Sequence, residues 1–373
     1  MKEWEYLHVT KQDEKRKYET EVRDMWRTCF GDPFDYEAFY FQNVYPANEV
    51  LCIMKDEMLG MLHLNPYECR IQESRQLLHY IVGVATKEQF RRQGIMRRLL
   101  EHALRQMYQN KEAITYLMPA DVAYYEPFSF VEISKEQRAC LTSKREKGKK
   151  LFSQWEEGVF YVSYASLNQN ATNDVWNHIV EKIDVYLDAV FDTYTVRSRS
   201  YFELLYQEKK CQNGDVIFVF RKDDQECIGY FAYAKQDEKI VVEQMVYEGM
   251  SLNGQEGQEK WLFCVEQYLS SDTKVEIVHA MQYMVRIVDV LACLKLFKNY
   301  FERFASNKKV IRITDSLLTE NEGLYAFYEE NGEVCVTKVT DASLDDVLEL
   351  TVADLAKMIF CSEEQIVCFA EVV

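Results

Sequence analysis

The chain has few of the features that mark a metal centre, a disulfide scaffold or a zinc-binding fold. Its 11 cysteines form no Cys-x-x-Cys pair, and its six histidines do not cluster near them. These spacings argue against a structural zinc site or a disulfide framework. Several cysteines lie inside apolar runs, namely Cys52, Cys264, Cys293 and Cys368. We therefore expect reduced core cysteines in a cytoplasmic protein, with no metal.

Long apolar runs and excess positive charge are also missing. The best candidate for a membrane span, Met284 to Phe297, is interrupted by three charged residues, and the N-terminal residues MKEWE do not resemble a signal peptide. The formal net charge is −17, which argues against nucleic acid or an anionic membrane as the main partner. The same charge favours a cationic substrate by electrostatic steering.

The length and composition predict a multidomain globular protein. A chain of 373 residues is long enough for two or three domains. Hydrophobic residues make up 48% of the chain and aromatic residues 14%, which is enough to build sizeable cores.

The most informative segment is an apolar strand followed by a turn rich in Arg, Gln and Gly, from which a helix begins directly. The strand is Tyr80 to Thr86, and the turn contains Arg91, Arg92 and Gly94. Backbone N–H groups at a helix N-terminus have no partner within the helix, and the helix dipole is positive there. Gly94 allows a ligand to approach the backbone closely, and the two arginines add positive charge. The segment therefore predicts a phosphate-binding site.

The helix after this turn is amphipathic, with Ile95, Leu99, Ala103, Leu104 and Met107 on one face. The turn has one glycine where the dinucleotide-binding fingerprint has three, and no Gly-Lys-Ser/Thr follows as in a Walker loop. From these residues alone, an ordinary strand–turn–helix with surface arginines remains open.

The turn also resembles a known family motif. Residues 91–96, Arg-Arg-Gln-Gly-Ile-Met, are similar to motif A of the GNAT acetyltransferases, Arg/Gln-x-x-Gly-x-Gly/Ala. Met96 replaces the last small residue, as in the Eis-like (enhanced intracellular survival) branch. The resemblance implies that the turn holds the pyrophosphate of acetyl-CoA, and that the strand binds the pantetheine arm and thioester carbonyl through backbone groups. The implied cofactor-binding residues are Val84, Ala85, Thr86, Arg91, Arg92, Gln93, Gly94, Ile95, Met96 and Arg97.

The first part of the chain reads as an α+β unit with a crossover after its central strand. We expect helices at Glu19–Phe30 and Phe34–Asn43, and strands at Val50–Lys55, Met58–Leu64, Cys69–Ile71, Leu77–Thr86 and Ala113–Met118. The charged run Ser143–Lys150 reads as a solvated boundary.

The second part repeats this order of helices, strands and a helix. We expect helices at Asp174–Val190, Ser198–Tyr206 and Gly257–Leu269, and strands at Asp215–Arg221, Cys227–Lys235 and Ile240–Tyr247. Its final helix is preceded by Glu248 to Gly254, which contains no cationic residue. We therefore expect a GNAT-like domain without a phosphate cradle.

The third part resembles the sterol-carrier-like C-terminal domain of Eis-type proteins. The similar residues are Val285–Asp289, Asp315–Leu318 and Glu349–Thr351. We expect strands at Val310–Thr314, Gly323–Glu329, Val334–Thr340 and Gln365–Val372, and a helix at Val352–Phe360 that begins with a capping box from Thr351 to Asp354.

The resulting expectation is an α+β chain with two tandem GNAT-like mixed-sheet domains followed by a sterol-carrier-like α+β domain. The predicted boundaries are residues 1–145, 146–280 and 281–373. By the same resemblance, we expect a homo-oligomer, a hexamer.

Acetyl transfer to an amine requires a proton donor for the leaving thiolate. Tyr125, Phe128 and Phe130 match the Eis-type pattern of Tyr, two residues, Phe, one residue and an aromatic residue. The resemblance therefore implies that Tyr125, and not Tyr124, is the general acid. A phenol with a pKa near 10 is a weaker acid than a thiol near 8.5, so this transfer is uphill by about 2 kcal/mol unless local dipoles lower the tyrosine value.

The base is less obvious. In Eis-type enzymes the C-terminal carboxylate enters the active site, and here that group belongs to Val373. An ordinary last strand remains the alternative for the apolar tail. Since an α-carboxylate has a pKa near 3.5, we expect it to position the ammonium, to assist through water, or to have a pKa raised by burial. His79 could be a base, but it is more typical of a core histidine.

The sequence thus predicts an acetyl-CoA-dependent N-acetyltransferase acting on a primary amine of an aminoglycoside, polyamine or lysine type. The alternative is a non-catalytic acyl-CoA- or lipid-binding protein that uses its C-terminal domain. The sequence does not identify the acceptor.

Overall fold

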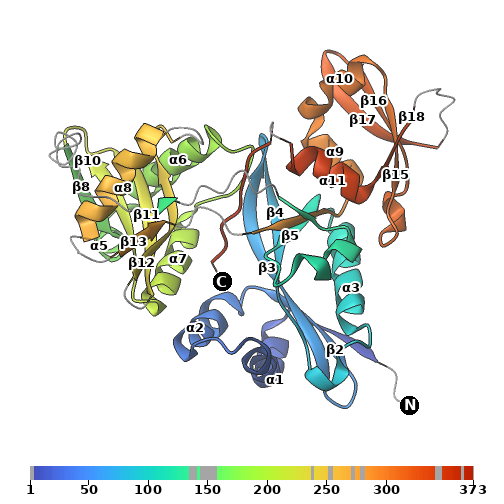
Figure 1. Ribbon diagram of the computed structural model, residues 1–373, viewed down its shortest axis with the longest axis horizontal. Helices are drawn as coiled ribbons and strands as arrows, with labels where there is room; N and C mark the ends of the chain where they lie inside the picture. The colour runs from blue at the N-terminus through green and yellow to red at the C-terminus, as the bar shows by residue number, and fades with distance from the viewer. Residues whose placement is uncertain are drawn as a thin grey trace. The chain divides into compact units, whose positions relative to one another are not determined.

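The computed structural model describes residues 4–133, 141–142, 158–236, 239–250, 255–269, 274–277, 282–340, 347–362 and 365–372 (Figure 1). Spatial contacts divide the chain into two compact units. Unit 1 comprises Met1–Pro33, Phe41–Ser134 and Gln282–Val367, and unit 2 comprises Phe34–Tyr40, Lys135–Met281 and Cys368–Val373. The chain is α+β, with mixed sheets in both units.

Unit 1 is built on a sheet with the strand order β1-β2-β3-β4-β5-β14-β6. The strands are β1 (Glu5–Val9), β2 (Glu49–Met54), β3 (Met58–Ile71), β4 (Ser74–Thr86), β5 (Ile114–Leu117), β14 (Met284–Ile287) and β6 (Val131–Glu132). The first four strands are antiparallel neighbours, whereas β4 and β5 are parallel. This parallel pair is the crossover that the sequence predicts.

Two helices cover the two sides of these strands, α1 (Gln12–Phe30) and α3 (Ile95–Gln109) (Figure 1). The predicted apolar face of α3 is confirmed, because Ile95, Leu99, Ala103, Leu104 and Met107 are all buried. The amphipathic pattern therefore sets how α3 packs on the sheet.

Helix α1 begins at Gln12, well before the predicted start at Glu19. The Glu14 carboxylate accepts hydrogen bonds from the backbone N–H groups of Thr10 and Lys11, both at 3.3 Å. These bonds satisfy donors at the helix N-terminus and extend the helix into a strongly charged stretch.

Two other predictions about the first part are corrected. The separate strands Met58–Leu64 and Cys69–Ile71 are one strand, β3, in which Pro66 is paired with His79 of β4. The second helix is shorter than Phe34–Asn43: α2 (Phe34–Phe39) is followed by a π-helical turn, Tyr40–Val44. The proline and the π turn are local irregularities that periodicity alone does not reveal.

The C-terminal part of unit 1 contains a second sheet with the order β17-β16-β15-β18. Its elements are α9 (Val290–Leu296), α10 (Glu302–Ser306), β15 (Val310–Thr314), β16 (Gly323–Glu330), β17 (Glu333–Val339), β18 (Val347–Thr351) and α11 (Val352–Phe360). The predicted capping box is present, since the Thr351 hydroxyl accepts from the Asp354 N–H at 3.1 Å and Asp354 accepts from the Thr351 N–H at 3.0 Å.

Strand β14 belongs to the first sheet, where it pairs with β5 through Met284 and Leu117 and with β6 through Val285 and Val131. The chain after residue 281 is therefore tied to the first part by a shared sheet. The three-domain division at 145/146 and 280/281 stays a proposal, and the run Ser143–Lys150 lies outside the described residues.

Unit 2 has a sheet with the order β7-β13-β12-β11-β10-β8. Its elements are β7 (Leu141–Thr142), β8 (Val159–Ser163), α5 (Tyr164–Asn170), α6 (Asn173–Asp188), β9 (Thr193–Thr195), α7 (Arg199–Cys211), β10 (Asp215–Arg221), β11 (Cys227–Gln236), β12 (Lys239–Tyr247), α8 (Gln255–Leu269) and β13 (Lys274–Ile277). Strands β12 and β13 are parallel, so unit 2 repeats the crossover of unit 1. Part of its predicted cradle-free turn, residues 251–254, lies outside the described residues.

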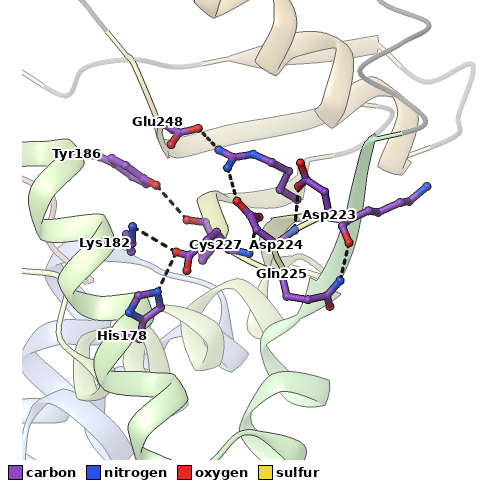
Figure 2. A network of polar contacts seen from close by, with 11 residues as sticks. His178, Lys182, Tyr186, Asp223, Asp224, Gln225, Cys227 and Glu248 are labelled. Carbon is purple, nitrogen blue, oxygen red and sulfur yellow. Dashed lines mark hydrogen bonds and ion pairs between the residues drawn. The ribbon is translucent and has the colours of Figure 1, made fainter.

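A polar network joins α6 of unit 2 to the turn between β10 and β11 (Figure 2). Glu226 accepts from His178 at 2.8 Å and pairs with Lys182 at 3.2 Å. Arg221 bonds to Asp224 at 2.6 Å and also pairs with Glu248. These contacts are half-exposed and connect neighbouring secondary structure, so we assign them a role in packing.

The predicted final strand, Gln365–Val372, is mostly wrong. Only Val367–Cys368 forms a strand, β19. The tail beyond it is nevertheless fixed within unit 2, where the Ala370 N–H donates to the Thr195 hydroxyl at 3.2 Å and Val372 is fully buried. The apolar pattern therefore mainly reflects burial, because sheet pairing in this tail is confined to the contact of β19 with β9.

Candidate active site

Strands β4 and β5 separate at the point where the sequence places the coenzyme. They pair at Tyr80 with Tyr116 and at Ile81 with Leu117. Strand β5 then ends, whereas β4 continues to Thr86. Among the described residues, no other strand pairs with this edge of β4 beyond Ile81. Backbone N–H and C=O groups on that edge can therefore bond to an extended ligand.

A β-bulge in β4 changes the direction of these backbone groups. Met61 pairs with Ala85 and His63 pairs with Val82, so β4 has one more residue than β3 in this interval. Gly83 lies in the bulge with a φ of +61°, and a Cβ atom there would lie 2.7 Å from the Trp26 ring. Only glycine fits this position, and the bulge is of the kind that re-aims the backbone beside functional sites.

The turn after β4 has the backbone of an anion site. Arg92 and Gly94 have φ values of 61° and 81°, both in the left-handed region. Gly94 is the N-cap of α3, and the first helical bond is donated by the Arg98 N–H to the Gly94 carbonyl at 3.1 Å. No atom lies within 4 Å of a Cβ built at Gly94. There is therefore open space at Gly94, beside the positive N-terminal end of α3 and its N–H groups without a partner in the helix.

Two guanidinium groups lie at the surface of this turn, and one of them contacts the end of β4, where Arg91 Nε donates to the Thr86 carbonyl at 3.4 Å. Arg91 and Arg92 are exposed, and neither forms an ion pair with a described residue. Arg97 pairs with Glu101 at 3.5 Å, and Lys87 pairs with Glu57. In a chain with a net charge of −17, this is a local positive site suited to a pyrophosphate.

Tyr125 lies between two short 3₁₀ turns, Val122–Tyr124 and Glu126–Phe128. It is 7% exposed, whereas Tyr124 is 58% exposed. Burial raises the pKa of Tyr125 to about 12. The hydroxyl is thus protonated over the physiological range, as a proton donor must be. Burial is the cause of this shift, so local dipoles do not lower the pKa of Tyr125 below its ordinary value.

The neighbour Phe128 connects this loop to the rest of the site. Its N–H donates to the Tyr125 carbonyl at 3.0 Å, and the Arg97 guanidinium lies 5.0 Å from its ring centroid. Its own carbonyl accepts from Arg286 Nε at 2.7 Å. Arg286 is not among the site residues predicted from the sequence, although a lone arginine inside the apolar strand Met284–Ile287 is a signal for such a role.

His79 is a buried core histidine, as its position in the strand favours. Its Nδ1 is 2.8 Å from Glu112 Oε1, and its backbone N–H donates to Glu112 Oε2 at 3.2 Å. Burial lowers the pKa of His79, but the hydrogen bond and charge of Glu112, with the charge of Glu49, raise it overall. Glu112 follows α3, so the pair connects the end of that helix to β4.

Two further properties concern the described residues as a whole. No group of three or more His, Cys, Asp or Glu side chains there is arranged to hold a metal ion. No described helix combines the length and hydropathy that crossing a membrane requires. Val373 itself lies outside the described residues, so the predicted location of its carboxylate stays a prediction.

A comparison with family models matches residues 12–132 to the acetyltransferase (GNAT) domain. This range contains the free edge of β4, the Arg-Gln-Gly turn and the Tyr125 loop. No curated protein matches the chain significantly.

Solved structures match over nearly the whole chain. A conserved protein of unknown function from Enterococcus faecalis V583, described as a probable N-acyltransferase, has a TM-score of 0.69 at 16% identity and covers 97% of this chain and 91% of its own. A GCN5-related N-acetyltransferase from Anabaena variabilis has a TM-score of 0.64 at 14% identity, covering 96% and 90%. Eis1 from Mycobacterium abscessus has a TM-score of 0.58 at 14% identity, covering 96% and 89%.

At these identities the solved structures establish the fold, and the family model establishes the character of the domain that holds the site. Residues 12–132 are a GNAT acetyltransferase domain, and the chain has the fold of the Eis-like GNAT proteins.

Proposed function

We propose that this protein is an acetyl-CoA-dependent N-acetyltransferase that acetylates a primary amine of an aminoglycoside, polyamine or lysine type. The observation that carries the proposal is the separation of β4 from β5 after Ile81, directly before the left-handed turn at Arg92 and Gly94. An extended chain ending in a pyrophosphate matches this combination of a free strand edge and a cationic helix N-terminus.

The residues present fit this coenzyme. Arg91 to Arg97 would hold the pyrophosphate through backbone N–H groups and guanidinium groups, and Val84 to Thr86 would bond the pantetheine arm. Val84 and Thr86 are partly exposed, whereas Ala85 between them is buried, so the strand presents alternate residues to a ligand. The coenzyme supplies an activated acetyl group as a thioester.

The remaining steps belong to the protein. A backbone N–H of the bulged part of β4 polarises the carbonyl. Tyr125 holds the proton that the leaving sulfur requires. The pKa of Tyr125 is about 12 and that of a thiol is near 8.5. Complete proton transfer from the phenol to a free thiolate is therefore uphill by about 5 kcal/mol. The phenol therefore acts by hydrogen bonding and by transferring its proton as the C–S bond breaks.

The acceptor ammonium must also lose a proton, which passes to water before the free amine attacks the thioester carbonyl. We propose that the Val373 carboxylate positions the ammonium, because its negative charge attracts the cationic substrate. Reduced thiols support a cytoplasmic location, since the described cysteines are free.

The test is acetyl-CoA turnover with a panel of aminoglycosides, polyamines and lysine peptides, with release of the free thiol as the measurement. We expect turnover with at least one amine class and loss of turnover in Tyr125→Phe. Tight acetyl-CoA binding without turnover on any amine would favour the non-catalytic acyl-CoA-binding alternative.

A further inference from the structure

Arg286 is a fully buried arginine that reaches from β14 to the loop that carries Tyr125. Its side chain is 0% exposed. Nε donates to the Phe128 carbonyl at 2.7 Å, and one terminal nitrogen bonds to the Ile287 carbonyl. The other terminal nitrogen donates to both carboxylate oxygens of Asp315, at 2.8 and 3.0 Å.

The Asp315 carboxylate is itself fixed by several hydrogen bonds. It is buried and also accepts from the backbone N–H groups of Leu317 at 3.1 Å and Leu318 at 3.2 Å. Asn321 donates to its second carboxylate oxygen at 2.9 Å and to the Val288 carbonyl at 2.9 Å. The guanidinium is therefore fixed by a carboxylate that accepts hydrogen bonds from three further donors.

The bond to the Phe128 carbonyl completes a clamp on the turn after Tyr125. The Phe128 N–H donates to the Tyr125 carbonyl at 3.0 Å, and the Ser129 N–H donates to the Glu126 carbonyl at 2.9 Å. The turn ends at Ser129 with a φ of 63°. With the Phe128 carbonyl bound to Arg286, both sides of the Phe128 residue are fixed, and the Tyr125 backbone is fixed through it.

Packing alone is a weak reason for such an arrangement. Burying an ion pair costs desolvation, and well-packed apolar residues of similar volume are often as stable or more stable. What an arginine adds is a set of donors in a rigid plane. Here the guanidinium plane connects the Asp315 carboxylate to the Phe128 carbonyl, and Phe128 is three residues from Tyr125.

We propose that Arg286, held by Asp315, is a positioning residue that sets the location of the Tyr125 hydroxyl. The inference rests on the proposed function of Tyr125 as the proton donor. Through Arg286, the C-terminal part of unit 1 contributes to the active site without touching the substrate. Since a misplacement of about 1 Å can cost about 100-fold in rate, weakening this bond lowers kcat more than it weakens coenzyme binding.

The first test is a double-mutant cycle on the full chain. Arg286→Lys keeps the charge but loses the planar donor set, and we expect kcat to fall by about 10- to 100-fold. The dissociation constant of acetyl-CoA should change by less than about twofold. In the Tyr125→Phe background, Arg286→Lys should lower kcat by less than about threefold, because the group that it positions is gone.

Controls separate positioning from general destabilisation. Phe327→Leu lowers stability in the core of the second sheet of unit 1, where Phe327 is 1% exposed, and should leave kcat unchanged at a temperature well below unfolding. Asp315→Asn is the second variant if Arg286→Lys folds poorly, and it should give the same kcat loss. Amide hydrogen exchange at Phe128 should accelerate in both variants, whereas exchange at Leu99 in α3 should not.

Equal kcat losses from Arg286→Lys in the wild-type and Tyr125→Phe backgrounds would overturn the proposal, as would wild-type kcat in both Arg286→Lys and Asp315→Asn. If instead Tyr125→Phe itself has wild-type activity, the proposed proton donor is wrong and the positioning role is overturned with it.

Discussion

The guanidinium of Arg97 lies 5.0 Å from the ring centroid of Phe128, which joins the first turn of α3 to the turn that follows Tyr125. A cation over an aromatic face is stabilised by about 0.5–2 kcal/mol, depending on exposure. The Phe128 N–H in turn donates to the Tyr125 carbonyl at 3.0 Å. The proposed pyrophosphate site and the proposed proton donor are therefore in contact through one phenylalanine.

Replacing Tyr125 with phenylalanine should lower kcat by about 10²- to 10⁴-fold, because general acid catalysis has about this effect. The affinity for acetyl-CoA should be nearly unchanged, since the substitution removes one hydroxyl and little surface. Steady-state kinetics and calorimetry measure the two quantities separately. Tyr124→Phe is the matched control, because Tyr124 is the adjacent tyrosine and is 58% exposed. A damaging Tyr124→Phe with a silent Tyr125→Phe would shift the assignment by one residue.

Gly94→Val should abolish measurable acetyl-CoA binding. A side chain at a φ of +81° is strained, and it would also occupy the open space beside the N-terminal N–H groups of α3. Gly332→Val is a close control, since Gly332 has the same φ of +81° and also has no atom within 4 Å of a built Cβ. It lies in the turn between β16 and β17, so it should carry the strain without the loss of binding. Unchanged binding by Gly94→Val in calorimetry would exclude the cradle assignment.

Local pattern predicted most of the framework. The predicted buried face of α3 agrees with the structure. Three elements have the predicted bounds at both ends, namely the strands Val310–Thr314 and Asp215–Arg221 and the helix Val352–Phe360. Each is a regular element whose apolar spacing or cap is fixed by its own sequence.

The features that could not be predicted depend on contacts between distant residues. Strand β14 enters the first sheet between β5 and β6, and no local pattern indicates that residues 284–287 pair with residues 114–117. Arg286 acquires its role only through this placement. The bulge at Gly83 is similar: a lone glycine in an apolar strand signals an irregularity, but its direction toward Trp26 comes from the packing of α1.

The pair His79 and Glu112 predicts a pH-dependent contribution to stability. Because the folded-state pKa of His79 is raised above its ordinary value near 6.5, the folded protein binds the proton more tightly than the unfolded chain. This contribution is fully present below the unfolded pKa and is lost as the pH rises through the folded pKa. Thermal unfolding at about pH 6 and about pH 8 should show a decrease in the melting temperature with rising pH that is smaller in Glu112→Gln.

The chain contains six histidines, so the difference in pH dependence between wild type and variant is the informative quantity. Glu226→Gln is a suitable comparison because Glu226 also accepts a histidine hydrogen bond at 2.8 Å but is partly exposed on unit 2. It should leave the pH dependence close to wild type, since exposed pairs contribute little. An identical pH dependence in wild type and Glu112→Gln would show that His79 binds its proton no more tightly in the folded state.

The chain end gives the most demanding prediction. If the Val373 carboxylate positions the acceptor ammonium, deleting Val373 should raise the KM for the amine and lower kcat, with no change in acetyl-CoA affinity. The deletion moves the charge by about 3.3 Å along an extended chain, which is large against the heavy-atom distance of about 2.6–3.2 Å that proton transfer requires. The preceding residue, Val372, is fully buried, so the tail is anchored up to that position.

Extending the chain tests the charge without shortening the anchored tail. A single glycine added after Val373 leaves every native residue in place but moves the carboxylate outward, and amidation of the native terminus removes the charge without moving the backbone. Both should reduce amine acetylation while the melting temperature stays close to wild type. A single glycine added before Met1 is the control for extending the chain by one residue. Because the three changes share only the displaced or missing charge, full activity in the amidated protein would show that Val373 contributes packing and no electrostatic role.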